Sequence, residues 1–231
     1  MGKNSMDINK NQFILSPPPL RRRAFTLAEI LVTLVIIGVV AAFTISALIN
    51  SYVESSTVAK VKKGLSTIGQ AKKLAELQHG PIIGWEFSNS SQIWDYLKPY
   101  VSLAKDCGTS SECYPRENLY YLNGSIQSAS NANSTSHKIM LADGSLMWLS
   151  KYDGKCVFSQ PYASNITDIC ASVGYDINGS KAPNTIGKDI FYYYINIDGV
   201  YPIDHNDCRK TSSGWGCAAY IIKNNNMKYL H

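Results

Sequence analysis

The longest uninterrupted apolar segment of the chain lies close to its N-terminus, between residues 25 and 49. It reads FTLAEILVTLVIIGVVAAFTISALI and contains one charged side chain, Glu29. At a rise of 1.5 Å per residue, a helix of this length extends roughly 37 Å, which exceeds the ~30 Å hydrocarbon layer of a bilayer. The pattern therefore predicts a membrane-spanning helix.

A helical period continues beyond the apolar segment, over residues 50–79. Apolar residues recur there at three- and four-residue spacings: Val58, Val61, Leu65, Ile68 and Ala75. This period indicates an amphipathic helix, and we expect its apolar stripe to pack on a sheet as the stem of an outer domain. The breaker Gly80-Pro81 should end the stem. The alternative is two helices with a joint near Asn50 and Ser51.

The remaining residues, 80–231, are polar and rich in turns. Residues 90–101 predict a short helix, and residues 123–136 form a loop rich in Ser and Asn. Asp-Gly pairs at residues 143–144 and 198–199 lie between apolar runs, which is a strong hairpin signal. Together these elements predict an α+β fold, in which the long N-terminal helix packs on a C-terminal antiparallel β-sheet.

The charge of the chain is concentrated at one end. The 231 residues carry a formal net charge of +5, from 22 basic and 17 acidic residues. Residues 1–24 hold five of the basic residues and one acid, whereas residues 80–231 hold 12 basic and 13 acidic residues. The balance of the outer part argues against electrostatic capture of nucleic acid. Basic residues directly before a span predict that this end stays in the cytoplasm.

The segment RRRAFTLAEILVTLVIIGVVAA, residues 21–42, resembles the prepilin signature shared by type IV pilins and the pseudopilins of type II secretion. It places a basic cluster, a small residue, an aromatic residue and a glutamate in one register. The resemblance implies that a prepilin peptidase cleaves between Ala24 and Phe25 and methylates the new amino group of Phe25. It also implies a pilin-like fold for the outer domain.

The resemblance divides the chain into four parts. These are a cytoplasmic leader (1–24), the transmembrane half of the N-terminal helix (25–49), the stem (50–79) and an extracytoplasmic domain (80–231). It implies a protein of the bacterial inner membrane that crosses once and then enters a pilus or pseudopilus. The implied partners are prepilin peptidase, other pilin or pseudopilin subunits and an inner-membrane assembly platform.

Glu29 is the charged residue of the predicted span, and charged residues in spans usually serve a function or have a partner. Cleavage before Phe25 would create a positive amino terminus. In a filament, Glu29 of one subunit could neutralise the terminus of a neighbour. The alternative is a glutamate of the first helical turn, favoured by the helix dipole.

All six cysteines lie in the outer part, and an even number outside the cytoplasm predicts disulfides. Close spacings favour three pairs: Cys107 with Cys113, Cys156 with Cys170, and Cys208 with Cys217. Other connectivities remain open. A zinc site is the alternative, but the chain lacks the short CxxC knuckles of zinc modules.

The densest polar motif is DINGSKAPNTIGKDIF, residues 176–191. Asp176, Asn178 and Gly179 have the opening spacing of a calcium loop, and Asn184 and Asp189 could add oxygen ligands. The segment also resembles a stretch of pilin-like proteins, and major pseudopilins hold calcium in a loop of comparable location. The alternative is a turn network in which these residues satisfy one another's backbone groups. No other cofactor is expected.

Enzymatic signatures are missing from the chain, which contains no GxxxxGK[ST], GxSxG or HExxH motif. The four histidines share no ligand-like spacing, and we expect each at the surface. The sequence therefore favours a structural subunit over an enzyme. One alternative is a minor tip pilin that binds DNA, a surface or a cargo protein, and another is a membrane-anchored extracytoplasmic protein that does not polymerise.

Overall fold

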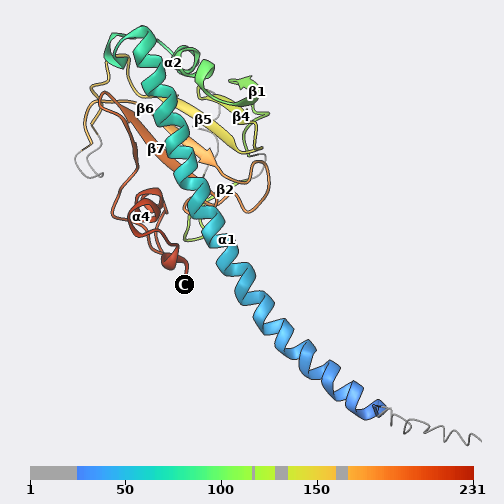
Figure 1. Cartoon of the computed structure of the whole chain (residues 1–231). Helices are drawn as coiled ribbons and strands as arrows, with labels where there is room; N and C mark the ends of the chain where they lie inside the picture. Colours follow the sequence, from blue (N-terminus) through green and yellow to red (C-terminus); the bar gives the residue numbers. More distant parts are fainter. Residues whose placement is uncertain (1–24, 116–117, 128–134, 160–165) are drawn as a thin grey trace, which may run out of the picture. The chain divides into compact units, whose positions relative to one another are not determined.

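The structure is a computed structural model, and it describes residues 25–115, 118–127, 135–159 and 166–231. The expected leader, with Ala24, lies outside the described residues. The chain divides into two compact units, residues 1–47 and residues 48–231. One helix, α1 (Leu27–His79), begins in the first unit and ends in the second (Figure 1). The helical conformation continues through Asn50 and Ser51.

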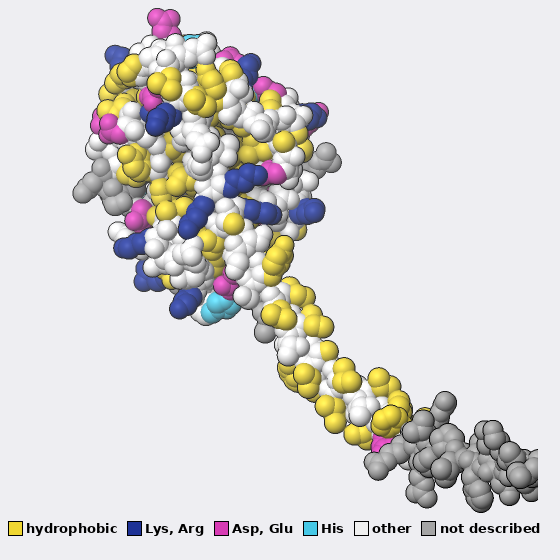
Figure 2. All heavy atoms as spheres, viewed as in Figure 1, with side chains coloured by type: hydrophobic (Ala, Val, Ile, Leu, Met, Phe, Trp, Pro, Cys, Tyr) yellow, Lys and Arg dark blue, Asp and Glu magenta, His cyan; other side chains and the backbone are white. Residues whose placement is uncertain are grey.

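The helical part of the first unit exposes its apolar side chains. The most hydrophobic 18-residue window of α1 has a mean hydropathy of 2.7, and none of it is buried within the chain. Figure 2 shows hydrophobic side chains over most of the visible face of this segment. By length and composition, α1 can cross a membrane. An apolar surface of this extent needs a lipid or protein environment.

The second unit is built on a six-stranded sheet in which every neighbouring pair is antiparallel, with the order β1-β4-β5-β6-β7-β8. The strands are β1 (Leu103–Gly108), β4 (His137–Leu141), β5 (Leu146–Lys151), β6 (Ile169–Asp176), β7 (Ile190–Asn196) and β8 (Val200–Pro202). Both Asp-Gly pairs lie between neighbouring strands, as predicted. The α+β class is confirmed.

Shorter elements surround this sheet. The predicted helix over residues 90–101 is α2 (Ser90–Leu97) followed by a 3₁₀ turn, η2 (Lys98–Tyr100). The other elements are η1 (Ile82–Gly84), β2 (Leu119–Tyr120), β3 (Ile126–Gln127), α4 (Cys217–Asn224) and η3 (Lys228–Leu230). Strand β3 falls inside the segment 123–136 that we expected to be loop, because it pairs with β2. Helix α4 has no counterpart in the prediction.

The sheet carries a hydrophobic core on each face. One core joins the stem residues Val61 and Ile68 to α2, α4 and the sheet, and there Tyr193 of β7 is fully buried. The other core contains Tyr192 and Tyr194 of the same strand, packed under loops. The alternation of side chains along a strand explains how neighbouring tyrosines reach opposite faces. The predicted apolar stripe of the stem is thus the face that packs on the sheet.

Close contact between α1 and the sheet depends on a glycine. A Cβ atom on Gly64 would lie 2.4 Å from Cδ1 of Tyr175 and 3.1 Å from the hydroxyl of Tyr193. The Tyr193 hydroxyl donates a hydrogen bond of 2.7 Å to the carbonyl of Val61. The lack of a side chain at Gly64 therefore leaves the space that Tyr175 and Tyr193 of the sheet occupy.

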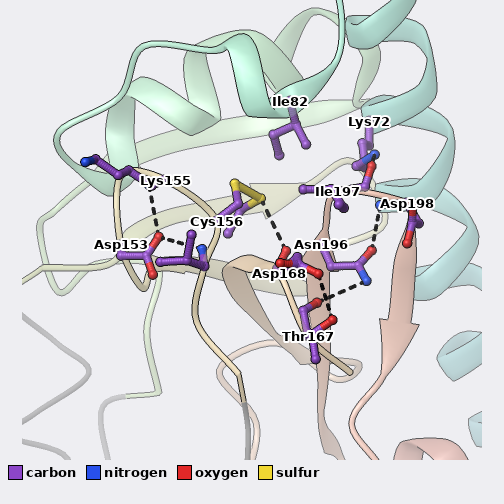
Figure 3. Close-up of a disulfide and its surroundings, with 12 residues drawn as sticks. Lys72, Ile82, Asp153, Lys155, Cys156, Thr167, Asp168, Asn196, Ile197 and Asp198 are labelled. Atoms are coloured by element: carbon purple, nitrogen blue, oxygen red, sulfur yellow. Dashed lines mark hydrogen bonds between the residues drawn. A yellow bond between two sulfur atoms is a disulfide. The ribbon is translucent and has the colours of Figure 1, made fainter. Parts of the chain in front are cut away.

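A buried lysine connects the C-terminal part of the stem to the sheet. Lys72, only 3% exposed, contacts Glu76 at 2.7 Å and donates to the carbonyl of Ile197 at 3.1 Å. Glu76 in turn accepts a hydrogen bond from the backbone N–H of Ile82. Figure 3 shows Lys72 and Ile197 together, near the disulfide of Cys156. One lysine thus connects the helix to the turn between β7 and β8.

The two edges of the sheet are irregular. Strand β1 is mostly exposed, and its register against β4 shifts twice, between Leu103 and Lys105 and between Asp106 and Gly108. Strand β8 at the other edge has three residues and ends at Pro202, which has no backbone N–H. Bulges, short strands and prolines are common devices at exposed edges.

Candidate functional site

The first turn of α1 places Glu29 in a capping box. The carboxylate oxygen Oε2 of Glu29 accepts hydrogen bonds from the backbone N–H of Thr26 at 2.8 Å and from its hydroxyl at 2.9 Å. The N–H of Glu29 donates to the Thr26 hydroxyl at 3.2 Å. This reciprocal pattern between the N-cap and the third helical residue satisfies N–H groups that a helix start leaves unpaired.

This geometry matches the alternative in which Glu29 is a glutamate of the first helical turn. It is also compatible with attraction of a neighbouring subunit's amino terminus by the same carboxylate. Both bonds to the carboxylate use the same oxygen, so the cap does not require Oε1. Phe25, at the expected cleavage position, precedes the cap and is 79% exposed. The cap fixes the carboxylate in the turn next to Phe25, where cleavage would create the amino terminus.

Three disulfides brace the second unit. They join Cys107 with Cys113, Cys156 with Cys170, and Cys208 with Cys217, which are the pairs that the close spacings favour. No described cysteine is free, and all six are therefore engaged with one another instead of a zinc ion. The last pair ties the start of α4 to the preceding loop.

Consecutive lysines of the stem reach three different turns of the outer domain. Lys60 donates to the carbonyl of Ile177 at 3.1 Å, Lys62 to the side chain of Asn225 at 2.8 Å, and Lys63 contacts Asp143 at 2.6 Å. Burial raises the pKa of Asp143, but hydrogen bonds from Lys63 and Ser145 outweigh this effect and lower the pKa to about 2. The stem therefore organises loops that lie far apart in the sequence.

The structure brings the predicted calcium ligands together in the loop between β6 and β7. Asp189 accepts hydrogen bonds from the N–H of Asn184 at 2.9 Å, the N–H of Thr185 at 2.5 Å and the amide of Asn178 at 3.1 Å. Asp176, at the end of β6, accepts from the N–H of Asn178 at 3.0 Å. These bonds are those of the predicted turn network, and Asp189 is its centre.

The turn network leaves three buried oxygens without a hydrogen-bond partner: Oδ2 of Asp176, Oδ1 of Asn178 and Oδ1 of Asn184. Asp176 is fully buried, and Asn184 is 1% exposed. Burial raises the pKa of Asp176 to about 8, with a further contribution from the charge of Asp189. Unpaired buried oxygens are rare, and oxygens of these types are the ligands that Ca²⁺ prefers.

A metal in this loop would depend on amide oxygens. Among the described residues, no three His, Cys, Asp or Glu side chains come together in a way that could hold a metal ion. The loop supplies two carboxylates and two amides, and this donor set suits a hard cation that takes oxygen ligands. It does not suit zinc, which favours nitrogen and sulfur.

The expectation that every histidine lies at the surface was wrong for His137. This residue of β4 is 7% exposed and stacks on Trp94 of α2, with ring centroids 5.8 Å apart. Its Nδ1 lies 2.8 Å from the hydroxyl oxygen of Ser91, and its Nε2 lies 2.7 Å from Oδ1 of Asp106. The three side chains come from α2, β1 and β4, so no linear motif could reveal the group.

Comparison with known proteins separates the chain into two matched segments. Residues 19–45 match the prokaryotic N-terminal methylation motif, the signature of type IV pilins. Residues 47–229, most of the chain, match the model of a family of unknown function (DUF6613). No curated protein and no solved structure matches the chain.

Proposed function

Because the chain belongs to the family of unknown function (DUF6613) and carries the N-terminal methylation motif of type IV pilins, we propose that this pilin-like protein is a structural subunit of a type II secretion pseudopilus or a type IV pilus. The observation that carries the proposal is the register of the motif. A basic cluster, the bond between Ala24 and Phe25, Glu29 and an exposed apolar helix follow one another without a gap.

In this proposal, prepilin peptidase removes residues 1–24 in the inner membrane and methylates Phe25. Residues 25–49 anchor the subunit in the membrane until the assembly platform transfers it to a filament of pilin subunits. There its exposed apolar side chains pack on those of neighbouring helices. The stem of residues 50–79 and the disulfide-braced domain of residues 80–231 stay outside the cytoplasm. The role is mechanical and needs no enzymatic activity.

Glu29 is assigned two functions that use one carboxylate. It closes the capping box of α1 and attracts the positive amino terminus of a neighbouring subunit. Opposite charges attract more strongly where the packed helices of a filament exclude water and lower the effective dielectric constant. Loss of this attraction should therefore prevent incorporation.

Two substitutions separate the two functions. Glu29→Gln keeps an oxygen that can accept the capping bonds, as glutamine serves in capping boxes, but it removes the charge. Glu29→Val removes both. We expect both variants to insert and to be cleaved at Phe25, as checked by mass spectrometry of the mature N-terminus. We also expect both to be missing from sheared filaments probed by immunoblot.

The outcome for Glu29→Gln decides the role of the charge. Normal incorporation of this variant, with failure of Glu29→Val, would show that the cap alone matters. Normal incorporation of both variants would overturn the assembly role of Glu29. An uncleaved leader in the wild-type protein would overturn the proposal as a whole, since a plain membrane anchor keeps its N-terminus.

A second proposed property is calcium binding by the loop between β6 and β7, and the three unpartnered buried oxygens support it. Asp176, Asn178 and Asn184 would supply these oxygens, and Asp189 would add its charge while holding the turn. A bound Ca²⁺ would neutralise the two buried carboxylates and stiffen the loop. Lys60, which already bonds the carbonyl of Ile177, links this loop to the stem.

Thermal unfolding in Ca²⁺ and in chelator tests this property. Ligand binding to the folded state alone stabilises by about 2.7 kcal/mol when the free ligand exceeds its Kd by ~100-fold, so the melting temperature should rise in Ca²⁺. Asp176→Asn keeps the shape of the side chain and should abolish the rise. Asp198→Asn, at an exposed hairpin turn, is the matched control and should keep it. An identical melting temperature of the wild type in both conditions would remove calcium from the proposal.

A further inference from the structure

The group formed by Ser91, His137 and Asp106 has the connectivity of a nucleophile, a base and an orienting carboxylate. Both ring nitrogens of His137 are engaged, with Ser91 on Nδ1 at 2.8 Å and Asp106 on Nε2 at 2.7 Å. Nucleophile and base within about 2.6–3.2 Å, with the base held by a third group, are the geometric signature of an activated hydroxyl. The proposed filament role does not use these residues.

The hydrogen-bond chemistry fixes the direction of each bond. An ionised carboxylate can only accept, so Nε2 of a neutral His137 must carry the proton and donate it to Asp106. Nδ1 is then the acceptor, and the Ser91 hydroxyl must donate to it. Asp106 is held in turn by the N–H of Gly108, which donates to the same oxygen at 3.0 Å. The serine proton thus points at a base.

The surroundings of the group are suited to a reaction at the serine. His137 has 8% of its side chain exposed and packs on Trp94, whereas Ser91 is partly exposed and Asp106 keeps 35% of its side chain accessible. The ring is therefore packed in place beside a serine that is partly exposed. Ser91 lies in the first turn of α2, whose N-cap is Asn89. Backbone N–H groups of a first turn favour negative charge nearby.

We propose that Ser91 is an activated nucleophile that cleaves small carboxylic esters, with His137 as the general base and Asp106 as a positioning residue. Oγ of Ser91 attacks the carbonyl carbon of the ester while its proton passes to Nδ1 of His137. The carbon–oxygen bond to the alcohol breaks, and the alcohol leaves with that proton. Water then attacks the acyl-serine and gives a proton to Nδ1 of His137, which passes it to Oγ as the bond between the acyl carbon and Oγ breaks and the carboxylic acid is released.

The test uses the full chain in detergent, with an alkyl fluorophosphonate as the covalent probe and p-nitrophenyl acetate as the ester. We expect the probe to label the wild-type protein at Ser91, located by peptide mass spectrometry, and we expect ester hydrolysis above the rate in buffer. Ser91→Ala should lose both. Ser88→Ala, at an exposed serine just before the same helix, should keep both.

Asp106→Asn tests the role of the carboxylate charge. Its amide oxygen can still accept from Nε2–H and from the N–H of Gly108, so the shape of the group is kept, but the negative charge that stabilises the imidazolium formed when His137 takes the Ser91 proton is lost. We expect labelling to slow by ~100-fold or more with an unchanged melting temperature. Absence of labelling in the wild type, labelling at another residue, or an equal rate in Asp106→Asn would overturn the proposal. None of these outcomes affects filament incorporation, which tests the structural function separately.

Discussion

Two alanine substitutions in the same helix should have opposite effects on stability. A Cβ atom on Gly69 would have no heavy atom within 4 Å, apart from its own helix, whereas one on Gly64 would meet the ring of Tyr175 at 2.4 Å and 2.5 Å. Alanine is better than glycine in a helix interior by about 0.8–1 kcal/mol. Gly69→Ala should therefore stabilise the protein by up to about 1 kcal/mol.

Gly64→Ala receives the same helical gain but adds an overlap that cannot be relieved cheaply. Tyr175 is fully buried in the core between α1 and the sheet, so its ring has no free space into which it can move. Overpacking of a core costs about 1–3 kcal/mol. The two variants should therefore differ by about 1–3 kcal/mol, with Gly64→Ala the less stable.

Thermal unfolding followed by near-ultraviolet circular dichroism measures this difference, because every tryptophan and tyrosine of the chain lies in the second unit. For a chain of this size, 1 kcal/mol corresponds to about 2–4 °C, so the two melting temperatures should separate by roughly 2–12 °C. A rise for Gly64→Ala equal to that for Gly69→Ala would refute the reasoning. It would mean that Tyr175 and Tyr193 can move to accommodate a methyl group and do not determine how closely the stem packs on the sheet.

Further measurements test other links between the stem and the outer domain. Tyr193→Phe removes the hydroxyl that bonds the stem backbone and should lower the stability by about 1 kcal/mol, read from the melting temperature. The contact of Lys63 with Asp143 should stabilise by less than about 1 kcal/mol because both side chains are partly exposed. Since the pKa of Asp143 is lowered in the folded state, this contribution is present above pH 4 and is lost as the pH falls toward 2. Lys63→Met should therefore make the stability depend less on pH between pH 4 and pH 2. Replacing Cys208 and Cys217 together by serine should cost about 2–3 kcal/mol and release the start of α4 first, which amide hydrogen exchange would detect.

The features that sequence predicted well are those encoded by neighbouring residues. The period of the stem, from Val58 to Ala75, specified the face that packs on the sheet, because a helix repeats every 3.6 residues whatever its partner is. The Asp143-Gly144 pair specified a hairpin for an equally local reason, since Gly144 adopts a positive φ of 83°.

The features that sequence missed depend on residues far apart in the chain. Helix α4 is only eight residues long and reads CAAYIIKN, an apolar run that suits a strand as well as a helix. Its contacts with the hydrophobic core favour the helix over the strand. The burial of Lys72 depends on a carbonyl more than a hundred residues away, and the group around His137 is assembled from three elements. No spacing in the sequence signals either arrangement.

Within the candidate site, the sequence pointed to residues that the fold brings together, but it did not reveal which hydrogen bonds each of them makes. The four oxygen-bearing residues of the β6–β7 loop do lie together, yet Asp189 is occupied by backbone groups while Asp176 is left with an unpaired oxygen. Burial produces this division, and burial is a property of the folded sheet. In the same way, the pattern Thr-x-x-Glu predicts the capping box of Glu29, but it does not predict which carboxylate oxygen accepts the hydrogen bonds.

The irregular edges of the sheet limit how copies of this protein can associate. An unprotected edge strand offers a free row of N–H and C=O groups, and copies of a sheet joined in that way grow into a continuous cross-strand fibre. The double bulge of β1 and Pro202 of β8 interrupt that row at both ends. Copies of this domain should therefore not join edge to edge into a continuous sheet. In the proposed filament, helix contacts would then hold the subunits together, and the filament could be taken apart without unravelling a sheet.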